Sequence, residues 1–167
     1  MIVLFTAVWN SAKAQQPRSG AYYSQDVTVR ATAAITDNLS LLTMRDMTLT
    51  ETGAVEGVII VPPSTSPYSG MMRINGRPGR QIRITYLSSE TLIEEGGSGG
   101  VVKANYRISG FETDNQSASV LLDIGEAVVR IGPEGTYHIW LGAEIDISNA
   151  TPGAYTSDFI IELEGSN

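Results

Sequence analysis

The chain has 167 residues, of which 42% are hydrophobic and 17% charged, with a formal net charge of −7 at pH 7. This length suits one domain with a sizeable core, and the acidic balance argues against nucleic acid and anionic membrane surfaces as partners. There is no cysteine, which excludes disulfides, thiolate chemistry and Cys-based zinc sites.

Residues 1–14 combine an apolar run at 2–9 with the triplet Ala12-Lys13-Ala14. An apolar run followed by an A-x-A-like site is typical of a secretory signal peptide. No Lys or Arg precedes the run, and a hydrophobic first strand is the alternative; the run is too short to span a bilayer. Residues 15–25 are polar and irregular, which predicts an N-terminal arm in front of one domain at 26–167.

The domain itself consists of short segments with period-2 alternation of apolar residues, separated by turns rich in Gly and Pro. We expect strands at 26–35, 39–43, 46–50, 55–61, 71–75, 80–86, 101–108, 119–124, 127–131, 137–147 and 155–163. About ten strands at this spacing are the signature of a β-sandwich or β-barrel. The proline-rich stretch at 62–67 is expected to form a loop.

The last two strands give the clearest pattern of the chain. Alternate residues from Tyr137 to Ile147 are apolar, Pro152-Gly153 fixes a turn, and Tyr155 continues the core face. This register places His138 and Trp140 on the outer face. An outward Trp140 would be either an interface anchor or covered by a loop of the same chain.

The sequence contains no catalytic or cofactor-binding signature. His138 is the single histidine, and no nucleophile or metal ligand stands at a motif spacing from it. The glycines at 96–100 precede an expected strand rather than a helix, so they predict a flexible hairpin tip and not a phosphate loop. The acidic pairs of the chain lack the ordered series of oxygen ligands that a calcium-binding loop requires. We therefore expect a protein that is not an enzyme and that needs no cofactor or metal.

A small basic cluster is expected on the hairpin at 71–86. Its members are Arg73, Arg77, Arg80 and Arg83. They could pair with acidic residues of the last two strands, namely Glu144, Asp146, Glu162 and Glu164. Such pairing could be internal or between subunits; between subunits, Arg77 and Arg80 with Glu162 and Glu164 would set register and orientation.

Three blocks of the sequence resemble a known bacterial exported family. They are residues 31–41, residues 72–85, and the ending from Trp140 to Leu163 with its Pro152-Gly153-Ala154-Tyr155 motif. The family is domain-of-unknown-function family four-four-zero-two (DUF4402), which is similar to spore-coat-U and chaperone–usher pilin subunits. The resemblance implies an all-β, immunoglobulin-like antiparallel sandwich, a signal peptide, and secretion through the periplasm to the cell surface.

The same resemblance implies a structural role in a pilus or surface filament. Pilins accept a donor strand from the next subunit into an apolar groove, which gives open head-to-tail polymers. By resemblance the groove walls would be Val27, Val29, Ala31, Ala33, Ile35, Phe159, Ile161 and Leu163. The N-terminal donor would present Ile2, Leu4, Val8, Ala21 and Tyr23. The partners would be copies of the same chain, together with a periplasmic chaperone and an outer-membrane usher.

A monomeric binding module for a carbohydrate or another surface protein is the alternative function. Exposed aromatic side chains gathered on one face would favour it. The residues that could form such a face are Tyr68, Tyr106 and Trp140.

Overall fold

The computed structural model describes residues 25–35, 38–49 and 57–166 and consists of strands, loops and one short 3-10 helix. The strands are β1 (Gln25–Ile35), β2 (Ser40–Arg45), β3 (Met47–Thr48), β4 (Val58–Val61), β5 (Gly70–Asn75), β6 (Gln81–Tyr86), β7 (Ser89–Ile93), β8 (Val101–Phe111), β9 (Val120–Leu121), β10 (Glu126–Arg130), β11 (Thr136–Asp146) and β12 (Gly153–Ser166). The helix is η1 (Gln116–Ala118). The predicted all-β fold is confirmed, with twelve strands instead of about ten.

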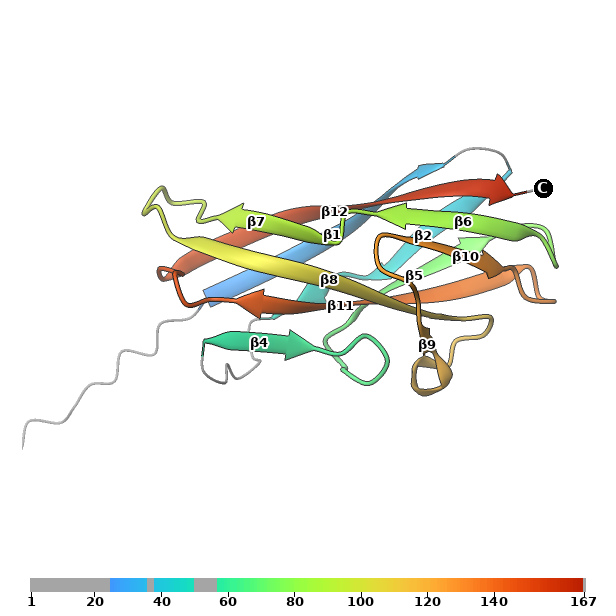
Figure 1. Ribbon diagram of the computed structural model, residues 1–167, viewed down its shortest axis with the longest axis horizontal. Coiled ribbons are helices and arrows are strands. Elements are labelled where there is room, and N and C mark those ends of the chain that lie inside the picture. Colours follow the sequence, from blue (N-terminus) through green and yellow to red (C-terminus); the bar gives the residue numbers. More distant parts are fainter. Residues whose placement is uncertain (1–24, 36–37, 50–56, 167) are drawn as a thin grey trace, which may run out of the picture.

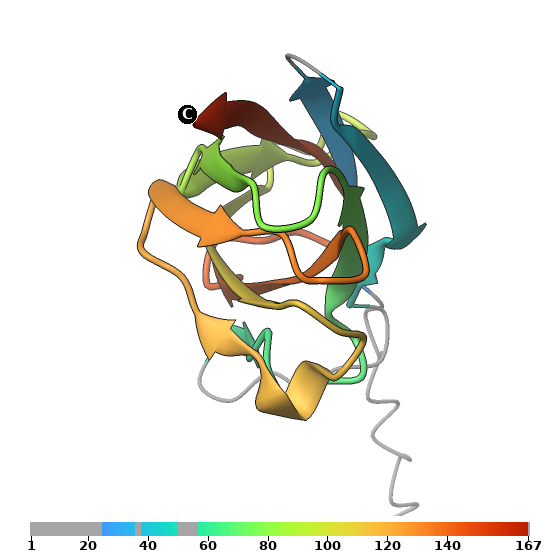
Figure 2. The same cartoon turned by 90° about the vertical axis from the view of Figure 1, so that its right-hand side faces the viewer.

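Two sheets pack face to face as a β-sandwich (Figures 1 and 2). One sheet has the order β10-β6-β12-β1-β3, and the other has the order β2-β5-β11-β8-β7, with β4 added beside β11 and β9 beside β8. Among the described strand pairs, β1 and β12 alone run parallel. The predicted sandwich is therefore antiparallel except where the first strand meets the last.

The core lies between the two sheets because alternate side chains of each strand point inward. Large aromatic side chains occupy its middle: Phe159 packs edge-on against Tyr106 with ring centroids 5.2 Å apart, and against Tyr86 at 5.5 Å. The contact with Tyr106 joins β8 of one sheet to β12 of the other, and the contact with Tyr86 joins β12 to its neighbour β6. The inward positions predicted on β11 and β12 are buried as expected.

A tyrosine corner fixes the turn between β11 and β12. The Tyr155 hydroxyl donates to the Thr151 carbonyl and accepts from the Thr151 amide, both at 2.9 Å. A Tyr at the start of a late strand that bonds to backbone a few residues upstream is a hallmark of immunoglobulin-like sandwiches. The Pro152-Gly153-Ala154-Tyr155 motif is thus explained: its tyrosine holds the turn that precedes it.

The outer face of β11 is covered by loops of the same chain. Trp140 is 1% exposed and His138 is 8% exposed, although both point away from the core. The end of β4 and the loop after it pass so close that a Cβ on Gly142 would lie 2.2 Å from the Val61 carbonyl oxygen and 2.7 Å from Pro63. Gln116 of η1 ties this loop in place by donating to the Pro63 carbonyl at 2.7 Å. Of the two alternatives for Trp140, the structure shows burial by its own chain.

The prediction of a basic hairpin at 71–86 is wrong. β5 and β6 belong to different sheets, so the turn Gly76-Arg77-Pro78-Gly79 crosses the sandwich instead of closing a hairpin. Arg73 therefore lies on the outer face of one sheet and Arg83 on the outer face of the other. The chain crosses because both strands bury their alternate apolar residues, Met72 and Ile74 against Ile82 and Ile84, between the layers.

Candidate assembly surface

The predicted groove walls form one continuous ladder. β1 pairs with β12 in parallel register from Gln25 opposite Gly153 to Ile35 opposite Leu163. The eight residues that were expected to line the groove all take inward positions: Val27, Val29, Ala31, Ala33, Ile35, Phe159, Ile161 and Leu163. Their exposure is near zero in the middle of the pair, where Val29 and Ile161 are fully buried, and rises to 39% at Ile35.

The structure corrects the expectation of an open groove between these two segments. No strand-wide gap separates β1 from β12, because each residue of β1 has a direct neighbour on β12. Neighbouring strands lie about 4.8 Å apart, which leaves no room for a third strand. The two segments that the prediction made the walls of the groove lie directly against each other.

On its other side β1 is held much less firmly. The two-residue strand β3 pairs with Thr28 and Val29 only, and the Leu49 amide donates to the Val27 carbonyl at 3.1 Å. Beyond that point the Thr43 hydroxyl donates to the Ala31 carbonyl at 2.9 Å. Within the described residues, no strand pairs with the half of β1 from 30 to 35 on this side, although β2 lies near it. An unpaired sheet edge of this kind is a template for strand addition.

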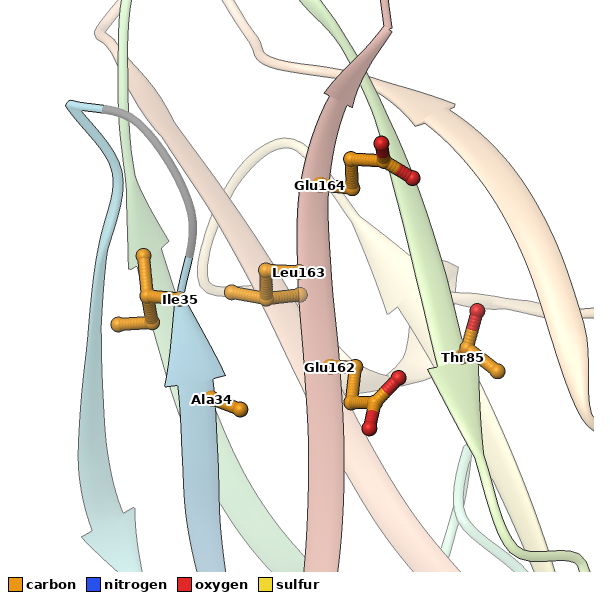
Figure 3. Close-up of a pocket in the computed structure, with 6 residues that line it drawn as sticks. All are labelled: Ala34, Ile35, Thr85, Glu162, Leu163 and Glu164. Carbon is orange, nitrogen blue, oxygen red and sulfur yellow. The ribbon is translucent and has the colours of Figure 1, made fainter.

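A hollow marks the place where β1 ends and β12 continues (Figure 3). It has a volume of about 300 Å³ and is lined by Ala34, Ile35, Thr85, Glu162, Leu163 and Glu164. A second hollow of about 370 Å³ shares Thr85 and Glu162 and extends over Leu87 and Ile160. Together they cross the outer face of the sheet from β1 over β12 to β6, with exposed aliphatic side chains beside two carboxylates.

The predicted intersubunit charges gather at this end of the sandwich. Arg80 packs over Gly165, so closely that a Cβ there would lie 1.9 Å from its guanidinium. Arg77 is exposed at the tip of the neighbouring turn, and Glu162 and Glu164 are exposed on β12. Glu164 stands opposite Arg83 in the β12–β6 register. Arg83 itself forms its ion pair with Glu126 of β10, with its Nε 3.4 Å from the Glu126 Oε1. The pairing of Arg77 and Arg80 with Glu162 and Glu164 between subunits stays a prediction.

The glycine loop lies at the opposite end and is closed by an internal carboxylate. Glu94 accepts hydrogen bonds from the Gly96 amide at 2.8 Å and the Ser98 amide at 2.9 Å. These two bonds hold the pKa of Glu94 below its ordinary value. The loop is a hairpin tip between β7 and β8, as predicted, but the tip is organised by Glu94. The Gly96 and Ser98 amides are therefore already occupied by a carboxylate of the same chain.

A buried polar contact between the sheets was missed by the sequence analysis. The Tyr106 hydroxyl donates to the Ser157 hydroxyl at 2.9 Å and to a Glu90 carboxylate oxygen at 3.3 Å, and Ser157 also donates to that oxygen. Burial raises the pKa of Tyr106 to about 12, although its hydrogen bond with Ser157 acts in the opposite direction. The one available signal was Ser157, a polar residue at a core position between Tyr155 and Phe159.

The structure bears directly on the alternative of a binding module with an aromatic face. Trp140 and Tyr106 are 1% and 2% exposed, so Tyr68 alone of the three reaches solvent, at 40%. These three residues therefore do not form the exposed aromatic face that would favour a binding module. The described residues also contain no group of three potential metal ligands among His, Cys, Asp and Glu. Within the same residues no helix is long and apolar enough to cross a membrane.

The predicted donor positions lie outside the described residues. They are Ile2, Leu4, Val8, Ala21 and Tyr23.

Comparison with known protein families gives a match over most of the chain. The model of the family described as domain of unknown function (DUF4402) matches residues 42–164, from within β2 to near the end of β12. β1 precedes the matched region. No curated protein matches the chain.

Proposed function

The chain belongs to the DUF4402 family, and we propose that it is a structural subunit of an extracellular bacterial filament, joined head to tail by exchange of its N-terminal strand. The proposal includes export through the periplasm and assembly from copies of the same chain. The donor is the N-terminal segment that ends with β1.

The observation that carries the proposal is the asymmetric attachment of β1. Along one of its two edges, eleven residues of β1 each have a direct neighbour on β12. Along the other edge β1 pairs with only two residues of β3. A strand held mainly by one partner strand can be replaced by the same strand of another copy. The receiving copy would keep the same ladder and the same buried side chains.

Such an exchange forms an open polymer when it is not reciprocal. The donated surface is β1 and the receiving surface is the edge of β12, so the contact is heterologous and leaves one free donor and one free acceptor. Reciprocal exchange between two copies would close a dimer instead. The filament proposal therefore predicts chains of many copies and not pairs.

The absence of cysteine allows a direct test by engineered disulfides. Thr32 and Ile160 are opposite each other in the β1–β12 register, and both are exposed on the outer sheet face. Adjacent strand positions fall within the Cα separation that a disulfide requires. A Thr32→Cys/Ile160→Cys variant would link β1 covalently to whichever copy provides its β12.

The matched control is Thr85→Cys/Glu162→Cys, which joins β6 to β12 on the same outer face. Assembled protein would be oxidised, boiled and separated on a non-reducing SDS gel. We expect a ladder of multimers for the first pair that collapses on reduction, and monomers for the control. The proposal fails if both pairs yield monomers or if the first pair stops at dimers.

A further inference from the structure

A row of side chains crosses the outer face of the seven-stranded sheet at the end near the β5–β6 turn. Leu42 of β2 is opposite Arg73 of β5, Arg73 is opposite His138 of β11, and His138 is opposite Phe111 of β8. The row therefore places two nitrogen-rich side chains side by side between two apolar ones. Neither β1 nor β12 contributes to it.

Arg73 and His138 each hold a buried nitrogen that has no partner. The Arg73 Nε and the His138 Nδ1 are shielded from solvent and form no hydrogen bond within the described residues. His138 is only 8% exposed. Buried polar atoms in folded proteins are nearly always hydrogen-bonded, because an unpaired one loses its hydration without compensation. Two such atoms on directly opposed residues point to a shared partner.

The surroundings hold these two groups in position. The His138 ring stacks on Trp140, with centroids 6.2 Å apart and planes at 28°, so the imidazole cannot turn freely. Next to the row, Asn75 donates to the Ser40 hydroxyl at 3.0 Å and is opposite Thr136 in the β5–β11 register. The site thus has apolar flanks, a polar border and one fixed positive charge on Arg73.

The geometry points to a binding site for a carboxylate group between Arg73 and His138. The Arg73 Nε–H is a donor, and His138 donates from Nδ1 in the matching tautomer. A carboxylate has two acceptor oxygens for two donors, and arginine binds it with charge-assisted hydrogen bonds. On a chain of net charge −7, exposed carboxylates of a second copy are an abundant source. A small free carboxylate is the other.

His138 is itself a unique reporter, because it is the single histidine of the chain. Its ring carbon-bound protons give one resolved set of signals in a ¹H–¹³C spectrum of the full chain. The probe is sodium acetate, with sodium chloride at the same ionic strength as reference. We expect acetate to shift the His138 signals to saturation and chloride to leave them nearly unmoved.

Arg73→Gln removes the charge and should weaken acetate binding at least about tenfold, the loss typical of one charge-assisted hydrogen bond. The matched control is Arg107→Gln, an exposed arginine on β8 of the same sheet, which should leave binding unchanged. Arg73→Lys keeps the charge without the Nε–H and should weaken binding by less. Arg73→Lys carries the test if Arg73→Gln does not fold, as judged from the backbone amide spectrum.

The acetate titration has three distinguishable outcomes. Equal shifts with acetate and chloride, or equal weakening by Arg73→Gln and Arg107→Gln, would overturn the proposal and leave ordered water as the partner. If acetate binds and the His138 signals also move with protein concentration, a second copy supplies the carboxylate. If acetate binds and the signals are independent of protein concentration, the natural ligand is a small carboxylate.

Discussion

Replacing Tyr155 by phenylalanine tests whether the tyrosine corner holds the last turn. The hydroxyl is the sole group removed, and Tyr155 is fully buried, so the packing of its ring stays in place. The hydroxyl donates to the Thr151 carbonyl and accepts from the Thr151 amide, each at 2.9 Å. Phenylalanine would leave both backbone groups without these partners.

The size of the effect follows from those two bonds. A net hydrogen bond is worth roughly 0.5–1.5 kcal/mol, and an unpaired buried group costs about 1–3 kcal/mol. Thr151 is half-buried, so water can reach part of the backbone that is left unpaired. We therefore expect Tyr155→Phe to lower the free energy of unfolding by about 2 kcal/mol. For a chain of this length this corresponds to a fall in Tm of about 4–8 °C.

The measurement is urea unfolding of wild type and variant, followed by circular dichroism. Tyr68→Phe is the matched control, because Tyr68 is 40% exposed and its hydroxyl makes no hydrogen bond to the described residues. Its free energy of unfolding should stay within about 0.5 kcal/mol of wild type. A loss below about 0.5 kcal/mol for Tyr155→Phe, or one equal to that of Tyr68→Phe, would refute the role of the hydroxyl.

Two further predictions concern packing and pH. Gly142→Ala would place a Cβ 2.2 Å from the Val61 carbonyl oxygen, and the forced shift of the covering loop should lower the free energy of unfolding by about 1–3 kcal/mol. Trp140 would become more exposed to a fluorescence quencher in that variant, and an unchanged quenching constant would contradict the account. The folded-state pKa of Glu94 lies below its ordinary value of 4.5, so its stabilising contribution is present above that value. It is lost as pH falls through the lower folded-state pKa. Glu94→Gln should therefore flatten the acid limb of a stability–pH curve, and a limb as steep as wild type would count against this.

The strands were predictable wherever one face is buried and the other exposed. β12 shows this best, because alternate residues from Tyr155 to Leu163 are buried and those between them exposed. β7 was not predicted, since Leu92 is its one buried apolar residue and gives no period-2 signal. A local pattern also cannot show that β5 and β6 lie in different sheets. That arrangement depends on the packing of the two layers.

The burial of His138 and Trp140 could not be predicted from alternation. Alternation tells which face of a strand a residue takes, whereas burial of the outer face depends on where distant loops return. Here Pro63 and Gln116, about fifty residues apart, meet over β11. The parallel pairing of β1 with β12 has the same origin. It joins the two ends of the domain, so no local pattern distinguishes it from an open groove with the same apolar walls.

Because β1 fills its own site, the proposed exchange is a competition between identical contacts. A tethered strand has an effective concentration on the order of millimolar, and the connection from Ile35 to Ser40 is short. Free subunits at lower concentration would therefore fill their own site and stay monomeric. The filament proposal then needs a factor that holds the edge of β12 open until the next donor arrives. A chaperone that occupies this edge is the partner whose chemistry fits. Intact purified subunits should then bind one another slowly, whereas a copy that lacks β1 should accept a donor strand faster but end the chain there, because it has no strand of its own to donate.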